Sequence, residues 1–380
     1  MSSATTSEQT RWLKKLSRSE KVWTWVSVLS GLGIGLMLIV QAHLLSTLIS
    51  DTLFEPVATE LAWPLIGGLL AALLVRALLG VLREWAGQQS SVRIRRRLRT
   101  ELMQQLARLG PAYIGDQRSG ELGSELLEQV EALDGFFARY LPQMALAAML
   151  PLVILAFVFP VNWAAGLIFL LTAPLVPLFM ALVGTRAAEA NRRNFAALSQ
   201  LSAHFLDVVQ GIVTLKLFDR SRGQAEVIEQ GAEEFRQRTM QVLRLAFLSS
   251  AVLEFFASIS IAVVAVYLGF SFLGHLDFGY WEGSVNLYQG LFILLLAPEF
   301  YLPLRELGTH YHAKQEAVAA AERLRVLLEQ EPVAIEAEGC GIQGAIRQVA
   351  LVDARLQYPG QATPVFSGVN LELKPGRILA

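Results

Sequence analysis

The sequence is poor in charge and in cysteine. Only 17% of its 380 residues are charged, whereas soluble domains carry about 25%. Its single cysteine, Cys340, excludes an internal disulfide framework and a thiolate metal cluster. Because 53% of the residues are hydrophobic, the composition indicates extensive contact with lipid rather than with water.

Lysine and arginine are absent from three long stretches, 22–75, 140–185 and 245–304. Each stretch is long enough for two membrane helices, because one crossing needs roughly 20 apolar residues. Since basic residues remain on the cytoplasmic side, the pattern predicts three hairpins with both chain ends in the cytoplasm. The six helices are expected at about 23–49, 62–83, 139–159, 163–184, 246–273 and 288–308.

Two long regions between the hairpins, about 84–138 and 185–245, also have a helical pattern. In the first, Leu98, Leu102 and Leu106 recur at helical spacing until Gly110-Pro111 breaks the pattern. Beside a membrane, the basic run Arg93–Arg99 favours a solvated face that touches anionic lipid over a nucleic-acid site. These regions predict long helical extensions into the cytosol.

Four segments are expected along the chain. Residues 1–22 form a cytosolic amphipathic lead segment, residues 23–328 the six-helix membrane domain, 329–345 a linker, and 346–380 the start of a strand-rich domain. In this last segment Val369–Leu373 alternates with a period of two. Two or three strands in about 35 residues cannot bury a core, so we expect the sequence to be a fragment.

This arrangement resembles the membrane half of an ABC exporter subunit. The resemblance rests on the six helices, the long cytosolic loops, the strands before Leu373–Arg377, and two motif regions, Ser119–Val130 and Val209–Phe218. It implies an all-α membrane protein of the type 1 exporter fold, with long cytosolic helical extensions and the first β-strands of a nucleotide-binding domain.

The resemblance also implies site residues. Coupling helices, which dock on the ATPase domains of such exporters, would contain Gly120, Glu121, Leu122, Gln210, Gly211 and Leu215. Tyr358 lies where the family stacks an aromatic ring on adenine. The full-length protein would be an ABC-type ATPase that uses ATP with Mg²⁺. The Gly-rich phosphate loop is not in this sequence, so no catalytic residue and no ATP hydrolysis are expected of it.

Longer stretches resemble the CydD-type subunits of the CydDC family, among them 138–147, 173–184, 191–195 and 297–305. The resemblance implies ATP-driven export of cysteine and glutathione across the bacterial inner membrane to the periplasm, a homologous CydC-type partner, and a link to haem and cytochrome bd assembly. The alternatives are a haem transporter of the same architecture and a lipid or drug exporter. An alternative from another class of protein is a membrane transporter or assembly subunit that has no ATPase.

Four charged residues in or next to the expected spans are candidates for a polar cavity: Arg76, Glu254, Glu299 and Arg305. A charge within a bilayer is costly unless it finds a partner or reaches the interface. Arg76 is close enough to the inner end of its helix to snorkel. Glu254 and Glu299 either line a cavity or belong to pairs that fix helix packing.

Three histidines, His43, His310 and His312, are candidate haem contacts. A single histidine on an apolar face, such as His43, is more often hydrogen-bonded within the core. His310 and His312 follow the last expected span, where histidines are more often solvated. No metal site is expected.

Overall fold

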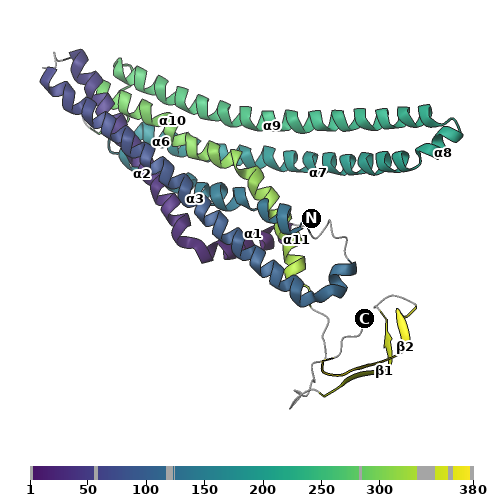
Figure 1. Cartoon of the computed structure of the whole chain (residues 1–380). Coiled ribbons are helices and arrows are strands. Elements are labelled where there is room, and N and C mark those ends of the chain that lie inside the picture. Colours follow the sequence, from purple (N-terminus) through teal and green to yellow (C-terminus); the bar gives the residue numbers. More distant parts are fainter. Residues whose placement is uncertain are drawn as a thin grey trace. The chain divides into compact units, whose positions relative to one another are not determined.

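The computed structural model describes residues 3–54, 59–116, 123, 125–281, 285–331, 347–357 and 363–376 (Figure 1). It divides into two units, which are treated separately below. The first comprises residues 1–95 and 132–319, and the second comprises residues 96–131 and 320–380.

The regular elements in the described part of the first unit are all helices. Its elements are α1 (Ser3–Ser17), the 3-10 turn η1 (Arg18–Glu20), α2 (Lys21–Phe54), α3 (Thr59–Asp116) as far as Arg95, the π-helical turn η3 (Phe136–Tyr140), α5 (Leu141–Val158), α6 (Trp163–Thr172), α7 (Leu175–Gln210), α8 (Ile212–Leu217), α9 (Ser221–Phe272), α10 (Leu287–Thr309) and the start of α11 (Tyr311–Glu329).

Five of the six expected membrane spans are confirmed by length and composition. They lie in α2, in the first half of α3, in η3–α5, at the end of α9 and in α10. The expected fourth span, 163–184, is helical but is divided between α6 and the start of α7. The interruption falls at Ala173-Pro174, where proline supplies no N–H for a helical hydrogen bond.

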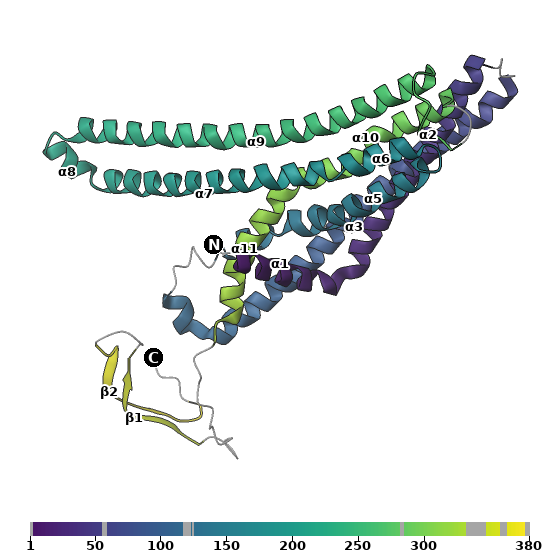
Figure 2. The same ribbon diagram turned by 180° about the vertical axis from the view of Figure 1, so that it is seen from behind.

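The long cytosolic region expected at 185–245 is helical, as predicted. Helices α7 and α9 lie side by side, and the short helix α8 joins them at one end of the pair (Figures 1 and 2). The exposed face of α9 carries charged pairs. There, hydrogen bonds from Arg236 and Gln237 lower the pKa of Glu233 to about 2. This carboxylate therefore stays ionised at any physiological pH and keeps the face polar.

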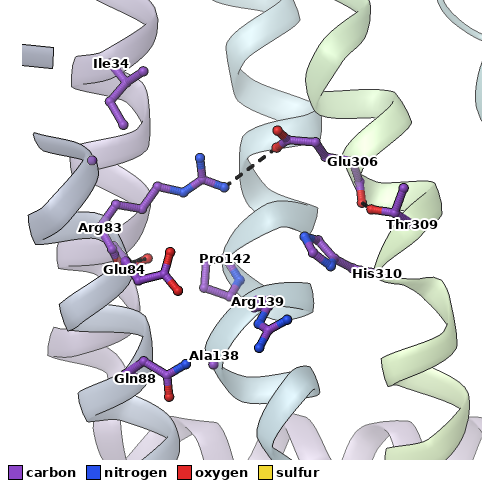
Figure 3. A pocket seen from close by; sticks show the side chains of 12 residues that line it. Ile34, Arg83, Glu84, Gln88, Ala138, Arg139, Pro142, Glu306, Thr309 and His310 are labelled. Carbon is purple, nitrogen blue, oxygen red and sulfur yellow. Dashed lines mark hydrogen bonds and ion pairs between the residues drawn. The ribbon is translucent and has the colours of Figure 1, made fainter. Parts of the chain in front are cut away.

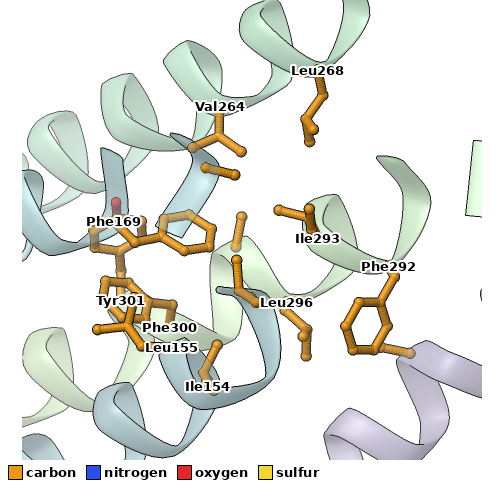
Figure 4. Packing of buried hydrophobic residues seen from close by; sticks show 14 of the residues in the cluster. Ile154, Leu155, Phe169, Val264, Leu268, Phe292, Ile293, Leu296, Phe300 and Tyr301 are labelled. Atoms are coloured by element: carbon orange, nitrogen blue, oxygen red, sulfur yellow. The ribbon is translucent and has the colours of Figure 1, made fainter. Parts of the chain in front are cut away.

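The apolar core of the first unit lies between α5, α6, α9 and α10 (Figure 4). The rings of Phe169 and Phe300 stack with centroids 4.8 Å apart. The buried Tyr301 hydroxyl satisfies its hydrogen bond with the Thr172 hydroxyl at 2.6 Å. The Asn162 side chain caps α6 by accepting from the Ala165 N–H at 2.9 Å. The ring stack and the hydroxyl pair fix α10 against α6.

Small and polar residues bring α2, α3 and η3 close together, as is typical of membrane helices. The Ser27 hydroxyl donates to the Arg83 carbonyl oxygen at 3.0 Å, and the hydroxyls of Thr24 and Ser90 are 3.1 Å apart. Only glycine fits at position 87, because a Cβ there would lie 2.6 Å from the Ala138 carbonyl oxygen. This packing sets the position of the neighbouring Arg83.

The second unit contains the end of α3, the π-helical turn η2 (Glu125–Gln129), the end of α11, and strands β1 (Val349–Leu356) and β2 (Phe366–Leu373). As expected, α3 is interrupted at Gly110, where φ is +77°. The two strands pair antiparallel with Leu351 opposite Leu371, which confirms the predicted strand pattern. Residues 377–380, at the end of the expected strand-rich segment, lie outside the described residues.

Candidate functional site

The first unit contains a cavity of about 790 Å³ between α3, η3–α5 and α10 (Figure 3). Its walls are polar and carry both signs of charge, with two arginines, two glutamates, a glutamine and a histidine among the lining residues: Arg83, Arg139, Glu84, Glu306, Gln88 and His310. Opposite charges around one cavity suit a small ligand that itself carries both signs.

Arg83 occupies the centre of this arrangement. Its Nη2 atom donates to Gln143 Oε1 at 2.7 Å and lies 3.8 Å from Glu306 Oε2, toward which it points (Figure 3). Gln143 is buried, and its amide in turn donates to the Pro303 carbonyl oxygen at 2.9 Å. Arg83 thus joins α3 to α5 by a short hydrogen bond and α3 to α10 by a longer ion pair. A ligand can replace Glu306 as the partner of Arg83 more easily than it can replace Gln143.

A smaller cavity of about 160 Å³ shares Arg83 and Glu306 with the larger one. Its walls add Arg76 and Glu299, each seven residues earlier on its helix. Seven residues are close to two helical turns, about 10.5 Å, so the members of each pair share a face. Two arginines on α3 and two glutamates on α10 therefore line these two adjoining cavities, and the four residues are called the polar tract below.

The structure separates the four predicted cavity residues into two pairs. Arg76 and Glu299 line the smaller cavity, and Arg76 also donates to Gln41 Oε1 at 3.3 Å. Glu254 and Arg305 form an ion pair with each other between α9 and α10, and neither is among the residues that line the two cavities. For this second pair the structure favours the alternative of a helix-packing contact.

Replacing Glu254 with glutamine is expected to change the rate of any transport through the cavity by less than about twofold. Glu254 pairs with Arg305 and lines neither of the two cavities, and glutamine can still accept a hydrogen bond from this arginine. Initial transport rates and the midpoint of thermal unfolding check this. A strong loss of transport by a normally folded protein would place Glu254 in the transport path.

The three candidate haem histidines are not brought together. His43 Nδ1 lies 2.6 Å from the Tyr288 hydroxyl at the start of α10, whereas His310 follows the other end of this helix and lines the larger cavity. The intervening 22 residues span about 33 Å of helix. His312 is exposed and does not line that cavity. Among the described residues there is no group of three potential metal ligands.

The coupling residues are described only in part. Gln210 ends α7, Gly211 caps it, and Leu215 lies in α8. Gly120, Glu121 and Leu122 lie outside the described residues, as does Tyr358. Helix α8 and the residue after it expose four apolar side chains, which is unusual for a solvated helix: Ile212, Val213, Leu217 and Phe218. Such a cluster is typical of a surface that binds another domain.

The arginines of the basic run Arg93–Arg99 form more contacts within the protein than those of a solvated face would. Arg93 lies over the Trp23 ring and 3.7 Å from Glu20, and Arg95 contacts Asp134 at 2.7 Å. Arg97 pairs with Glu101 and Arg99 with Glu131. Much of its charge is therefore compensated within the protein.

Sequence reasoning missed Arg83, Glu306, Arg139 and Gln143. Arg83 and Glu306 fall at the ends of their expected spans, where charges are usual and draw no attention. The signal that could have found them is the seven-residue spacing from Arg76 and from Glu299.

Comparison with known proteins defines the class. Residues 21–292 match the family model of the ABC transporter transmembrane region. The chain therefore belongs to this family and is a membrane protein.

More particular relatives are found among transport proteins. The chain is 49% identical over 325 residues to the transport ATP-binding protein AarD of Providencia stuartii, covering 85% of this chain and 55% of AarD. It is 46% identical over 346 residues to the glutathione/L-cysteine transport system ATP-binding/permease protein CydD of Escherichia coli, covering 87% and 59%. The CydC protein of the corresponding system of Bacillus subtilis is 31% identical over 293 residues, covering 77% and 50%. The chain thus spans somewhat more than half the length of the first two of these relatives.

Proposed function

We propose that the full-length protein is a CydD-type half of an ATP-driven exporter that moves cysteine and glutathione from cytoplasm to periplasm. The observation that carries the proposal is the polar tract of Arg83, Glu306, Arg76 and Glu299, which is described above. The names of the relatives point to the same substrates. The proposal extends to a role in cytochrome bd assembly, for which the family resemblance is the support.

The chemistry of the cavity suits these thiols. Cysteine carries one carboxylate and one ammonium group, and glutathione carries two carboxylates and one ammonium group. Arg83 and Arg139 can donate two hydrogen bonds each to a carboxylate, while Glu84 and Glu306 can accept from an ammonium group. The volume of about 790 Å³ falls within the roughly 300–1,000 Å³ of small-molecule sites. A lipid or drug cargo would favour an apolar lining instead.

Coupling to ATP would run through the cytosolic elements. We assign residues 23–328 to the membrane domain, 329–345 to a linker and 346–380 to the start of the ATPase domain. The apolar cluster on α8, together with Gln210, Gly211 and Leu215, would dock on an ATPase domain, as would the region of Gly120, Glu121 and Leu122. Tyr358 would stack on the adenine of ATP bound with Mg²⁺. ATP then shifts the population of transporter conformations by binding one of them better.

The proposed partner is a homologous CydC-type subunit, and its support is the 31% identity to a CydC protein. The proposed location is the bacterial inner membrane with both chain ends in the cytoplasm. The support for this orientation is the absence of lysine and arginine from 22–75, 140–185 and 245–304.

The test uses the full-length protein and its partner, reconstituted together in vesicles. ATP-dependent movement of radiolabelled glutathione and cysteine is measured, with haem as a parallel cargo and a non-hydrolysable ATP analogue as control. The proposal expects thiol movement that requires hydrolysis. Movement of haem without thiols would retain the ATP-driven class and overturn the substrate, and movement of thiols without ATP would overturn the class.

A further inference from the structure

A third cavity lies on the surface of the first unit, away from the polar tract. It has a volume of about 400 Å³ and is formed by the end of α1, by η1, by the start of α2 and by the start of α5. None of its lining residues belongs to either cavity of the polar tract. None of the roles proposed above, whether in transport or in coupling to ATP, involves this cavity.

One side of this cavity is cationic. Lys14, Arg18 and Lys21 line it, and no acidic residue is among its described lining. Within the described part of the chain these three cations form no ion pair. The nearest acidic residue in sequence, Glu20, is directed to Arg93, 3.7 Å from its guanidinium. Three unpaired cations around one concave surface favour an anionic group.

The other side of the cavity is apolar. Trp25, Leu141, Met144 and Ala145 line it. Trp25 is 52% exposed, and on the same helix Val22 and Leu29 are also exposed. Since this helix is a membrane span, these side chains face hydrocarbon and not water. A tryptophan next to lysines at the end of a span marks the interface between headgroups and acyl chains.

We propose that this cavity binds one anionic phospholipid of the cytoplasmic leaflet, with its phosphate among Lys14, Arg18 and Lys21. Its acyl chain would lie along Trp25, Leu141 and Met144. A free phosphate or nucleotide would gain from the cations but would leave the apolar side without a ligand. The lipid would hold α1 and η1 against α2 and α5, and so fix the lead segment on the membrane surface.

Binding is measured on the full-length complex by native mass spectrometry, with phosphatidylglycerol and phosphatidylethanolamine added in equal amounts. We compare K14Q/R18Q with the matched control R11Q/K15Q. Both double variants remove two charges from the same short region, but Arg11 and Lys15 are exposed and lie outside the cavity lining. Each cation near an anionic lipid surface contributes roughly a fivefold gain in affinity. K14Q/R18Q should therefore bind phosphatidylglycerol about 25-fold more weakly, and R11Q/K15Q should bind it as the wild type does.

Three results would overturn the proposal. Equal losses in the two double variants would show diffuse attraction and no defined site. Equal retention of the two lipids by the wild type would show that the headgroup charge is not recognised. Displacement of phosphatidylglycerol by millimolar sn-glycerol 3-phosphate would identify a site for a soluble phosphate. As a second variant, A145W fills the apolar side without changing charge, and it should also weaken lipid retention.

Discussion

Replacing Arg83 with alanine is expected to slow ATP-dependent glutathione transport at least tenfold while the protein still folds. The change removes the only group in the described structure that contacts both Gln143 and Glu306 across the cavity. Hydrogen bonds to charged groups contribute about 1.5–3 kcal/mol, which corresponds to roughly 10- to 150-fold if the loss falls on substrate binding. Initial rates at several glutathione concentrations, measured in vesicles, would detect it.

Two further variants make this test specific. Arg83→Lys retains the charge but loses the planar fork that can bind a carboxylate through two hydrogen bonds, so an intermediate rate is expected. Arg97→Ala removes an arginine from the same helix that pairs with Glu101 four residues away and has a side chain 64% exposed. It should transport at the wild-type rate. Wild-type transport by Arg83→Ala would remove the polar tract from the proposed mechanism.

The membrane topology could be predicted from the sequence because it depends on the order of charged and apolar residues along the chain. Charged side chains are costly in lipid, so lysine and arginine are rare within a span whatever its neighbours are. The gaps at 22–75, 140–185 and 245–304 therefore located the helices without any knowledge of packing. The fourth span was predicted as one continuous helix because apolar content alone does not show that Pro174 divides it.

The cavity could not be predicted in the same way, because it depends on the rotation of three helices that are distant in sequence. Adjacent residues on a helix point about 100° apart. Arg305 therefore reaches Glu254 on α9, while the next residue, Glu306, lines the cavity with Arg83. Sequence reasoning selected the first of these neighbours and missed the second. Charge identifies candidates within a span, and packing decides which of them meet.

The coupling and nucleotide residues remain predictions from resemblance. For α8 the structure adds a physical reason. This helix has only six residues, and the side chains of Val213 and Leu217 are 68% and 80% exposed, which is unfavourable in water. Its apolar side chains need a second surface to be buried. No comparable argument from described side chains is available for Tyr358, because it lies outside the described residues.

Replacing Gly87 with alanine is expected to destabilise the membrane domain by about 1–3 kcal/mol, the usual cost of overpacking. The new Cβ would lie 2.6 Å from the Ala138 carbonyl oxygen. That atom belongs to the backbone of η3 and cannot move by a simple change of side-chain rotamer. Helix α3 must then separate from η3, and Arg83, one turn earlier on α3, moves with it.

Gly80→Ala is the matched control for this substitution. Gly80 lies on the same helix seven residues earlier, and a Cβ there would meet nothing within 4 Å. Since alanine is favoured over glycine within a helix by roughly 0.5–1 kcal/mol, Gly80→Ala should be neutral or slightly stabilising. The midpoint of thermal unfolding of the detergent-solubilised complex distinguishes the two variants. Equal midpoints would mean that η3 and α3 are not in the tight contact that positions Arg83 at the cavity.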